Sequence, residues 1–278
     1  RFDDYINSVW DANIKYSVYN QNIPSYFVSN LNTVRDTINN QRSSIGKEGE
    51  QFVFITDIHW TNNQKHSPSL INYILQNTSV SKCILGGDYI AAHSTKDTAI
   101  LYLRQCINAF KGLDGNIKYI YGNHDTNRNQ NVEAAYLTEG EAFRIIQGNM
   151  ENNVTYGDYF YYYFDNPISK TRFLCLTTGP VTNAMSETGI PTTELNWVTS
   201  VLNDTPADYH CIVFIHAVKS NAASEGYTPS AQDLFEILDA NNSTENKCTV
   251  EAVFSGHTHK DFNGTTTGGI PVIITDTD

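Results

Sequence analysis

The sequence predicts a mixed α/β domain built on a largely parallel sheet. From residue 51 onward, short apolar runs typical of buried strands alternate with longer segments whose apolar residues recur at helical spacing. Such strand–helix–strand alternation indicates crossover connections, which join parallel strands. Five of the apolar runs lead directly into segments that carry Asp, Asn or His. The carboxyl ends of parallel strands gather at one edge of a sheet, where functional sites form.

Residues 1–48 are expected to form a helical extension ahead of a catalytic domain at 49–278. Pro24 suits the first turn of a helix, and Gly46 is a natural stop. Between them the apolar residues follow helical spacing, at Phe27, Leu31, Val34 and Ile38. An earlier helix is expected around Tyr5, Val9, Trp10 and Ile14. A helical extension packed on the domain is the favoured interpretation, with a linker to a further module or an oligomerisation arm as the alternative.

The first half of the domain is expected to hold three strands that alternate with three helices. The strands are predicted over 51–56, 81–86 and 116–121. The first helix is predicted to start at Ser67-Pro68, the second to span 95–111 and stop at Gly112, and the third to lie near 132–147.

The second half of the domain opens with an aromatic-rich strand, predicted over 155–164 and paired with 170–177 across a turn at Asn166-Pro167. Its Tyr and Phe residues could line a wall for a sugar or a base. A strand buried on both faces with tyrosine tips in solvent is the preferred interpretation. Two further helix–strand pairs follow, with helices that open near Pro191 and Pro229 and strands over 210–215 and 249–254.

Metal-binding side chains follow five of these strands in short segments. In chain order the segments are Asp57-Ile58-His59, Gly87-Asp88, Gly122-Asn123-His124-Asp125, His216 and Gly256-His257-Thr258-His259. Carboxylate, amide oxygen and imidazole bind divalent transition metals and leave positions open for water and substrate. Each segment alone has an ordinary explanation, such as a capping Asp or a satisfied core His. The ordinary explanation does not account for all five.

The ordered set resembles the calcineurin-like metallophosphoesterase family, whose pattern is D-x-H, G-D, G-N-H-D/E, a lone H and G-H-x-H. All five blocks are present here in that order, between residues 57 and 259. The resemblance implies a four-layer αββα sandwich of two mixed sheets flanked by helices; periodicity alone supports only mixed α/β. It also implies a phosphomonoesterase or phosphodiesterase in which a metal-bridging hydroxide attacks phosphorus in line.

The same resemblance implies ligands for two divalent transition metal ions, drawn from Mn, Fe, Zn, Co and Ni. The residues expected at one ion are Asp57, His59, Asp88 and His259. Those expected at the second ion, with Asp88 bridging the two, are Asn123, His216 and His257. Residues two apart in an extended segment point the same way, which suits both the Asp57/His59 pair and the His257/His259 pair.

The residue expected to assist catalysis is His124, which by family analogy would donate a hydrogen bond to a phosphoryl oxygen or a proton to the leaving alkoxide. Asp125 is expected to orient the His124 ring, and a turn-capping role is compatible with that. Two further candidates for substrate binding are Trp60, beside His59, and Arg128, whose fork could reach a phosphate oxygen. Packing beside the loop explains Trp60 equally well. Ala91 stands where many members of the family carry another acidic residue, so one contact that supports the metal ligands in those members is not expected here.

Composition limits the partners of this protein. The formal net charge of −12, without a Lys/Arg cluster, disfavours an extended nucleic-acid surface, so the expected partner is a small phosphoester or phosphodiester substrate. A nuclease of the same fold and a non-catalytic scaffold remain as alternatives. The five Cys lack the C-x-x-C spacing of a thiolate zinc site, and no apolar run is long enough to span a membrane.

The ends of the chain suggest a domain taken from a longer protein. The sequence begins at Arg1 without Met and ends just after the apolar run at 270–275. A larger multidomain protein, such as a cell-surface or phage-tail appendage, is the expected context. Cytoplasmic, secreted and appendage locations are all compatible with the sequence.

Overall fold

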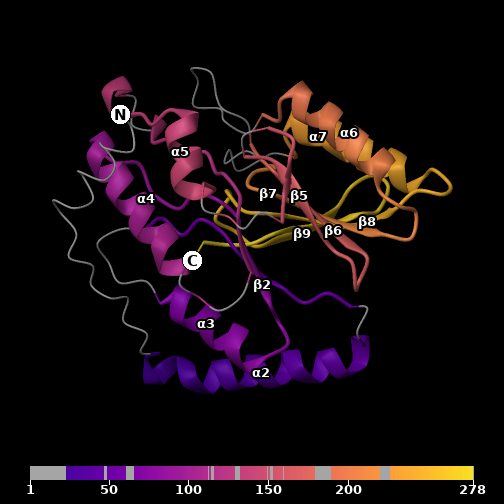
Figure 1. The fold of residues 1–278 in the computed structure, drawn as a ribbon, viewed down its shortest axis with the longest axis horizontal. Coiled ribbons are helices and arrows are strands. Elements are labelled where there is room, and N and C mark those ends of the chain that lie inside the picture. The colour runs from indigo at the N-terminus through magenta and orange to yellow at the C-terminus, as the bar shows by residue number, and fades with distance from the viewer. Residues whose placement is uncertain are drawn as a thin grey trace.

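The computed structural model describes residues 23–46, 49–60, 66–111, 113, 116–128, 132–148, 150, 153–158, 160–178, 189–219 and 226–277. Two sheets pack face to face, and helices cover their outer faces (Figure 1). This arrangement confirms the predicted αββα sandwich. Within the described ranges, no helix has the length and apolar character that a membrane crossing needs.

The smaller sheet contains three strands, β1 (Val53–Ile55), β2 (Lys82–Leu85) and β3 (Asn116–Tyr119), paired in that order. The helices α3 (Ser67–Asn77) and α4 (Lys96–Lys111) connect the strands, and α5 (Glu139–Ile146) follows β3. Each connection is a helical crossover, so both pairings are parallel. The smaller sheet therefore differs from the mixed sheet that was expected.

The larger sheet contains seven strands in the order β4-β5-β6-β7-β8-β10-β9. Their bounds are Thr155–Tyr156 (β4), Tyr162–Asn166 (β5), Thr171–Leu176 (β6), His210–Ile215 (β7), Thr249–Ser255 (β8), Phe262–Thr265 (β9) and Pro271–Ile274 (β10). The central strands β6, β7, β8 and β10 are parallel, and β4, β5 and β9 are antiparallel to their neighbours. Helices α6 (Thr192–Asp204) and α7 (Pro229–Asn242) lie along its outer face (Figure 1). The β9–β10 hairpin was not predicted.

Aromatic side chains join the two sheets. The Phe52 ring, which precedes β1, lies 5.2 Å from the rings of Phe214 and Phe254 on the larger sheet. Phe54 of β1 lies 5.6 Å from Phe214. Rings at these separations pack edge to face or tilted, which favours a fixed orientation between the sheets. That orientation brings the carboxyl ends of β1, β2 and β3 beside those of β7 and β8.

Two predicted elements are divided in the structure. The helix predicted near 132–147 is a short 3-10 turn, η2 (Glu133–Ala135), followed by α5, because Thr138 and Glu141 form a capping box that starts a new helix. The aromatic strand is split into β4 and β5 by a bend where Phe160 takes a φ of 71°. Tyr162 is fully buried within the inter-sheet core. The burial agrees with the preferred interpretation, but the Tyr162 hydroxyl does not reach solvent, because it donates to the buried Tyr119 carbonyl at 3.1 Å.

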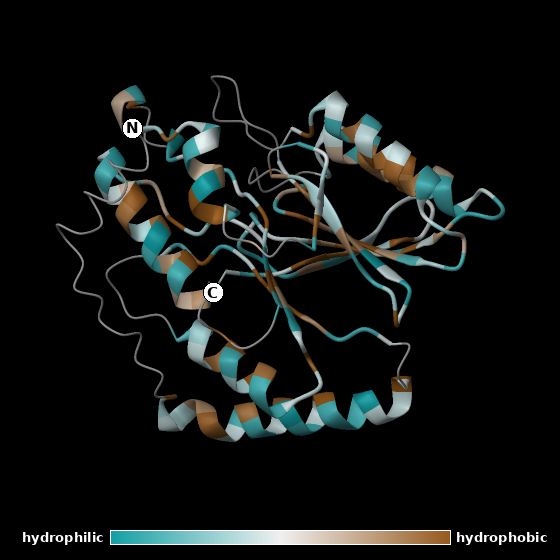
Figure 2. Ribbon diagram, in the orientation of Figure 1, coloured by the Kyte–Doolittle hydropathy of each residue, from teal (hydrophilic) through white to brown (hydrophobic). Residues whose placement is uncertain are grey.

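The N-terminal helix α2 (Ser25–Ile45) lies against α3 (Figure 1) and carries apolar residues at intervals along a largely hydrophilic surface (Figure 2). Leu31 packs with Ile74 and Val80, and the Arg35 guanidinium donates to the Tyr73 hydroxyl at 3.0 Å. Gly46 ends the helix with a φ of 70°. The helix expected around Tyr5 to Ile14 lies outside the described residues, and the division at residue 48 stays a prediction.

Candidate metal centre

The five predicted segments converge where the carboxyl edges of the two sheets meet. Backbone hydrogen bonds tie the segments together: Asp57 N–H donates to the Gly87 carbonyl at 3.0 Å, and Gly256 N–H donates to the His216 carbonyl at 2.9 Å. A third bond crosses between the sheets, because the His257 N–H donates to Asp57 Oδ2 at 2.8 Å. The side chains that follow β1 and β8 are therefore held together although they lie 200 positions apart.

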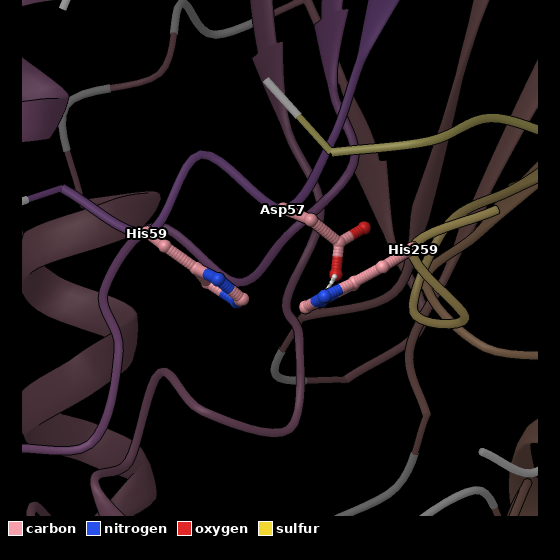
Figure 3. Close-up of side chains that lie close together, drawn as sticks. All are labelled: Asp57, His59 and His259. Carbon is pink, nitrogen blue, oxygen red and sulfur yellow. Dashed lines mark ion pairs between the residues drawn. The ribbon is translucent and has the colours of Figure 1, made fainter.

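The first group of candidate ligands contains Asp57, His59 and His259. Their donor atoms all lie within 4.8 Å of one another. His259 Nε2 is 3.2 Å from Asp57 Oδ1, and the rings of His59 and His259 have centroids 4.9 Å apart. Figure 3 shows the three side chains pointing toward one another, with His59 on one side and the Asp57–His259 pair on the other.

The second group contains Asp88, His216 and His257, whose donor atoms also lie within 4.8 Å of one another. Asn123 belongs with them, because its Oδ1 is 3.1 Å from His216 Nε2 and 2.8 Å from His257 Nδ1. The other ring nitrogen of His216, Nδ1, donates to the Gly86 carbonyl at 2.8 Å. That bond fixes the ring so that Nε2 faces the cluster.

Asp88 lies between the two groups. Its Oδ2 is 3.2 Å from His216 Nε2 and 3.7 Å from His59 Nε2. Its Oδ1 accepts the backbone N–H of His124 at 2.8 Å, which leaves Oδ2 directed into the cluster. One carboxylate thus faces both candidate ligand groups.

Three side-chain atoms that could bind a metal are buried and, within the described part of the chain, have no hydrogen-bond partner. They are Asp57 Oδ1, His59 Nε2 and Asp88 Oδ2. Leaving a buried polar atom unsatisfied costs about 1–3 kcal/mol, and more for a charged group. Carboxylate oxygen and neutral imidazole nitrogen are ligands of divalent transition metals. The residues present therefore fit divalent metal ions.

The backbone is strained at five of the candidate ligands. A positive φ between 46° and 72° is found at Asp57, His59, Asp88, His257 and His259. Residues with a Cβ rarely adopt this left-handed region, and each instance costs of order 1–3 kcal/mol. Strain of this kind persists where surrounding structure fixes it, and it clusters at functional sites.

Two glycines allow the backbone to pass close beside Asp88. Gly87 has a φ of 94°, and a Cβ there would meet the Gly122 nitrogen at 2.6 Å. A Cβ on Gly122 would lie 2.3 Å from both the nitrogen and Oδ1 of Asp88. A side chain at Gly122 would therefore displace the Asp88 carboxylate, and one at Gly87 would collide with the backbone of Gly122.

The charges within the cluster shift the pKa values of its members. Burial tends to raise the pKa of Asp88, but the nearby rings of His216 and His124 outweigh it and hold that pKa well below its usual range. Burial lowers the pKa of His216, yet the carboxylates of Asp88 and Asp57 raise it to about 10. Burial, together with the charge on His216, lowers the pKa of His257 to about 3. Without a metal, His216 is positively charged at neutral pH and His257 is neutral.

His124 lies at the rim of the cluster and forms a third group with His59 and Asp88, whose ligand atoms also lie within 4.8 Å of one another. Its Nε2 is 3.8 Å from Asp88 Oδ2, and its side chain is 24% exposed. Burial lowers the pKa of His124, against the opposing charge of Asp88. The ring is therefore a neutral imidazole near pH 7, with one N–H to donate.

Asp125 contacts the backbone of two loops, and its predicted role in orienting the His124 ring stays a prediction. Its carboxylate accepts the N–H groups of Gly122 at 2.8 Å, Tyr89 at 2.8 Å and Asp88 at 3.1 Å. Burial and the charge of Asp88 raise the pKa of Asp125 well above its usual range. Asp125 thus holds the loops after β2 and β3 in register with each other.

Trp60 packs beside the loop. Its indole Nε1 donates to Gln105 Oε1 of α4 at 3.3 Å, and its ring packs against the core under α3, α4 and α5. Arg128 lies over the ring of Tyr136, with 6.0 Å between the guanidinium carbon and the ring centroid. The predicted roles of Trp60 and Arg128 in substrate binding stay predictions.

Sequence reasoning missed one supporting residue. The buried hydroxyl of Thr56 donates to Asp57 Oδ2 at 2.8 Å and also lies 3.2 Å from the Gly86 carbonyl. A polar residue at the end of an apolar strand, one position before a candidate ligand, is the signal that could have indicated it.

Comparison with known proteins adds a family and a fold. The sequence model of the calcineurin-like phosphoesterase family matches residues 51–261. A dimetal phosphatase from Danio rerio has a similar structure, with a TM-score of 0.62 and 14% identity over 81% of this chain and 87% of that one. Purple acid phosphatase PPD1 from yellow lupin (Lupinus luteus) seeds has a TM-score of 0.54 and 13% identity over 83% of this chain and 45% of that one. No curated protein sequence matches.

Proposed function

This chain belongs to the calcineurin-like phosphoesterase family, and on that premise we propose that it hydrolyses small phosphomonoesters or phosphodiesters at a pair of divalent metal ions. It is a metal-dependent phosphoric ester hydrolase. We propose two ions, the ligands named below and a small phosphoester substrate.

The observation that carries the proposal is the position of Asp88 Oδ2. This buried oxygen has no hydrogen bond among the described residues and faces His59 at 3.7 Å and His216 at 3.2 Å. A carboxylate that lies between two sets of ligands is typical of sites that bind two adjacent metal ions. One ion alone would leave one of the two sets without a purpose.

The proposed ligands divide as the two groups divide. Asp57, His59 and His259 would hold one ion, Asn123, His216 and His257 would hold the other, and Asp88 lies where it could serve both. When bound, such ions lower the pKa of a coordinated water and offset the charge that develops on the phosphoryl oxygens. Imidazole-rich ligand sets with carboxylates suit Mn, Fe, Zn, Co or Ni.

His124 is the residue proposed to contact the substrate. Its pKa is lowered by burial, so at neutral pH it is better suited to donate a hydrogen bond from its N–H than to deliver a full proton. A donor fixed at the rim of the cluster would stabilise a non-bridging phosphoryl oxygen as negative charge accumulates there. The Asp125 carboxylate supports this position indirectly, because it accepts backbone N–H groups from the loops after β2 and β3.

The alternatives receive less support. The formal net charge of −12 disfavours a nuclease, since nucleic-acid affinity depends on Lys and Arg that neutralise phosphates. A scaffold that had lost catalysis would have no use for strained backbone at five candidate ligands.

The test is hydrolysis of a mono-aryl and a bis-aryl phosphate by protein supplemented with each candidate metal. Asp88→Asn is expected to lower turnover at least about a hundredfold, because even residues that only support metal ligands cost 10–100-fold. Asp208→Asn is the matched control, since Asp208 is 60% exposed and pairs with Lys170 far from the cluster. Turnover that persists in purified, folded Asp88→Asn protein would rule the proposal out.

A further inference from the structure

Two buried cysteines face each other outside the metal centre. Cys211 lies in β7, and Cys248 immediately precedes β8, the neighbouring parallel strand. Their sulfur atoms are 3.6 Å apart, and both residues are buried. A disulfide requires an S–S distance of about 2.05 Å, so the two sulfurs need to approach by roughly 1.5 Å.

The surroundings of Cys248 favour a thiolate. The Cys211 thiol donates to its sulfur, and the Asn241 side-chain amide lies 3.8 Å from the same sulfur. The hydrogen bond from Cys211 lowers the pKa of Cys248 to about 6, with help from Asn241 and against the effect of burial. By contrast, burial raises the pKa of Cys175, on the adjacent strand β6, to about 12. Because the thiolate is the reactive form of cysteine, Cys248 is expected to react more readily than Cys175.

A cavity lies near Cys248, although neither cysteine is among its lining residues. It measures about 220 Å³ and lies between α6 and α7, where its lining includes Leu202, Asn203, Ile237, Asn241 and Lys247. Two of these residues also contact Cys248, since its sulfur lies 3.9 Å from the Leu202 carbonyl and 3.8 Å from the Asn241 amide. Leu202 and Asn241 therefore lie between the cavity and Cys248. The volume of the cavity exceeds that of several waters, at about 30 Å³ each, and is large enough to hold a small oxidant beside these two residues.

We propose that Cys211 and Cys248 are a peroxide-sensitive thiol pair that closes to a disulfide between β7 and β8. The Cys248 thiolate attacks one oxygen of hydrogen peroxide, so that an S–O bond forms, the O–O bond breaks and the departing hydroxide takes up a proton to become water. The Cys211 sulfur then attacks the Cys248 sulfur; the S–S bond forms and the S–O bond breaks. The hydroxide that leaves takes the Cys211 proton and becomes a second water. Two thiols lose two electrons, and one peroxide is reduced to two waters.

The disulfide affects stability and not the chemistry of the metal centre. It joins β7 and β8 near the ends of these strands that lie opposite to His216 and His257. The cross-link closes a long loop that contains α7, and such closure stabilises a protein by restricting the unfolded chain. We expect a rise of several degrees in Tm on oxidation, with the rate of phosphoester hydrolysis unchanged.

The test is peptide mass spectrometry of the intact protein after treatment with hydrogen peroxide, denaturation and alkylation of the remaining thiols. The expected result is a cross-linked pair of peptides that contain Cys211 and Cys248, reversed by dithiothreitol, with Cys83 and Cys175 still alkylated. Full alkylation of Cys211 and Cys248 would overturn the proposal. So would a sulfinic acid at Cys248 without the cross-link.

Two variants distinguish a specific Cys211–Cys248 disulfide from unspecific oxidation of cysteines. Cys211→Ser is expected to abolish the cross-link and to leave a sulfenic acid at Cys248 that dimedone labels. Cys175→Ser, which removes another buried strand cysteine, is the matched control and should keep the cross-link. A cross-link from Cys248 to a different cysteine in Cys211→Ser would contradict the assignment. The peptide analysis of the protein without substitutions tests the Cys211–Cys248 disulfide even if a variant fails to fold.

Discussion

The Oδ2 atom of Asp88 lies 3.2 Å from the Nε2 atom of His216, although the two residues belong to different sheets. Asp88 follows β2 of the smaller sheet, and His216 follows β7 of the larger one. The rings of Phe52, Phe214 and Phe254 pack between the two sheets and favour the orientation that brings these two side chains together. Each of the two candidate ligand groups draws residues from loops of both sheets, so neither sheet alone provides a complete group.

The first prediction concerns metal content. His216→Ala is expected to reduce bound metal by about one equivalent, because it removes a ligand from the second group and leaves Asp57, His59 and His259 in place. The measurement is elemental analysis of protein purified with manganese and then desalted. His210→Ala is the control, since His210 is about half exposed and pairs with Glu251 at the other end of β7. Equal metal content in the two variants would contradict the assignment of His216.

The second prediction separates two roles for His124. His124→Ala is expected to lower kcat about 10²–10³-fold with metal content retained, since its side chain lies at the rim of both groups. If the ring stabilises a phosphoryl oxygen, the loss should be similar for aryl phosphates whose leaving groups differ in pKa. A loss that grows steeply as the leaving group becomes poorer would instead indicate proton donation to the leaving alkoxide.

The third prediction uses two glycines with opposite surroundings. Gly122→Ala is expected to destabilise the fold by about 1–3 kcal/mol and to disrupt metal binding, because its Cβ would lie 2.3 Å from Asp88. Gly140→Ala places a Cβ in open space within α5 and is expected to stabilise the protein by about 0.5–1 kcal/mol. Urea unfolding monitored by circular dichroism measures both effects. A stable Gly122→Ala protein with normal metal content would show that the close approach at Asp88 is dispensable.

The fourth prediction concerns the pH dependence of stability. Burial raises the pKa of Glu194 well above its unfolded value of 4.5, although the Thr177 N–H donates to its Oε1. The folded protein thus holds this proton more tightly than the unfolded chain. The stabilising contribution of the neutral carboxyl is present below pH 4.5 and is lost as the pH rises through the raised pKa.

The comparison is between the native protein and Glu194→Gln, which keeps an oxygen for the Thr177 N–H. The free energy of unfolding of the native protein should fall relative to that of the variant as the pH rises from 4.5. Glu236→Gln, at an exposed position of α7, is the control and should follow the native protein. Parallel curves for the native protein and Glu194→Gln would mean that Glu194 titrates normally.

Much of the fold and most of the candidate site were predictable because their signals are local. The apolar run before Asp57 and the helical spacing after Ser67-Pro68 depend on neighbouring residues, and both elements form where expected. Ligands at the carboxyl ends of parallel strands converge by topology, which is why Asp57 and His257 could be placed together from the sequence.

The features that escaped prediction depend on contacts between distant segments. The carboxylate of Asp125 binds the backbone after β2, 36 residues away, and no sequence pattern reports that contact. The strand β9 carries few strand-forming residues and exists because β10 pairs with it. The facing sulfurs of Cys211 and Cys248 depend on the register between β7 and β8.

The most direct test of the central claim is a crystal structure of the manganese-loaded protein with anomalous diffraction. The account predicts two anomalous peaks about 3.5–4 Å apart, with Asp88 Oδ2 between them and with Asp57 and His216 on opposite sides. A single peak, or two peaks remote from Asp88, would contradict it.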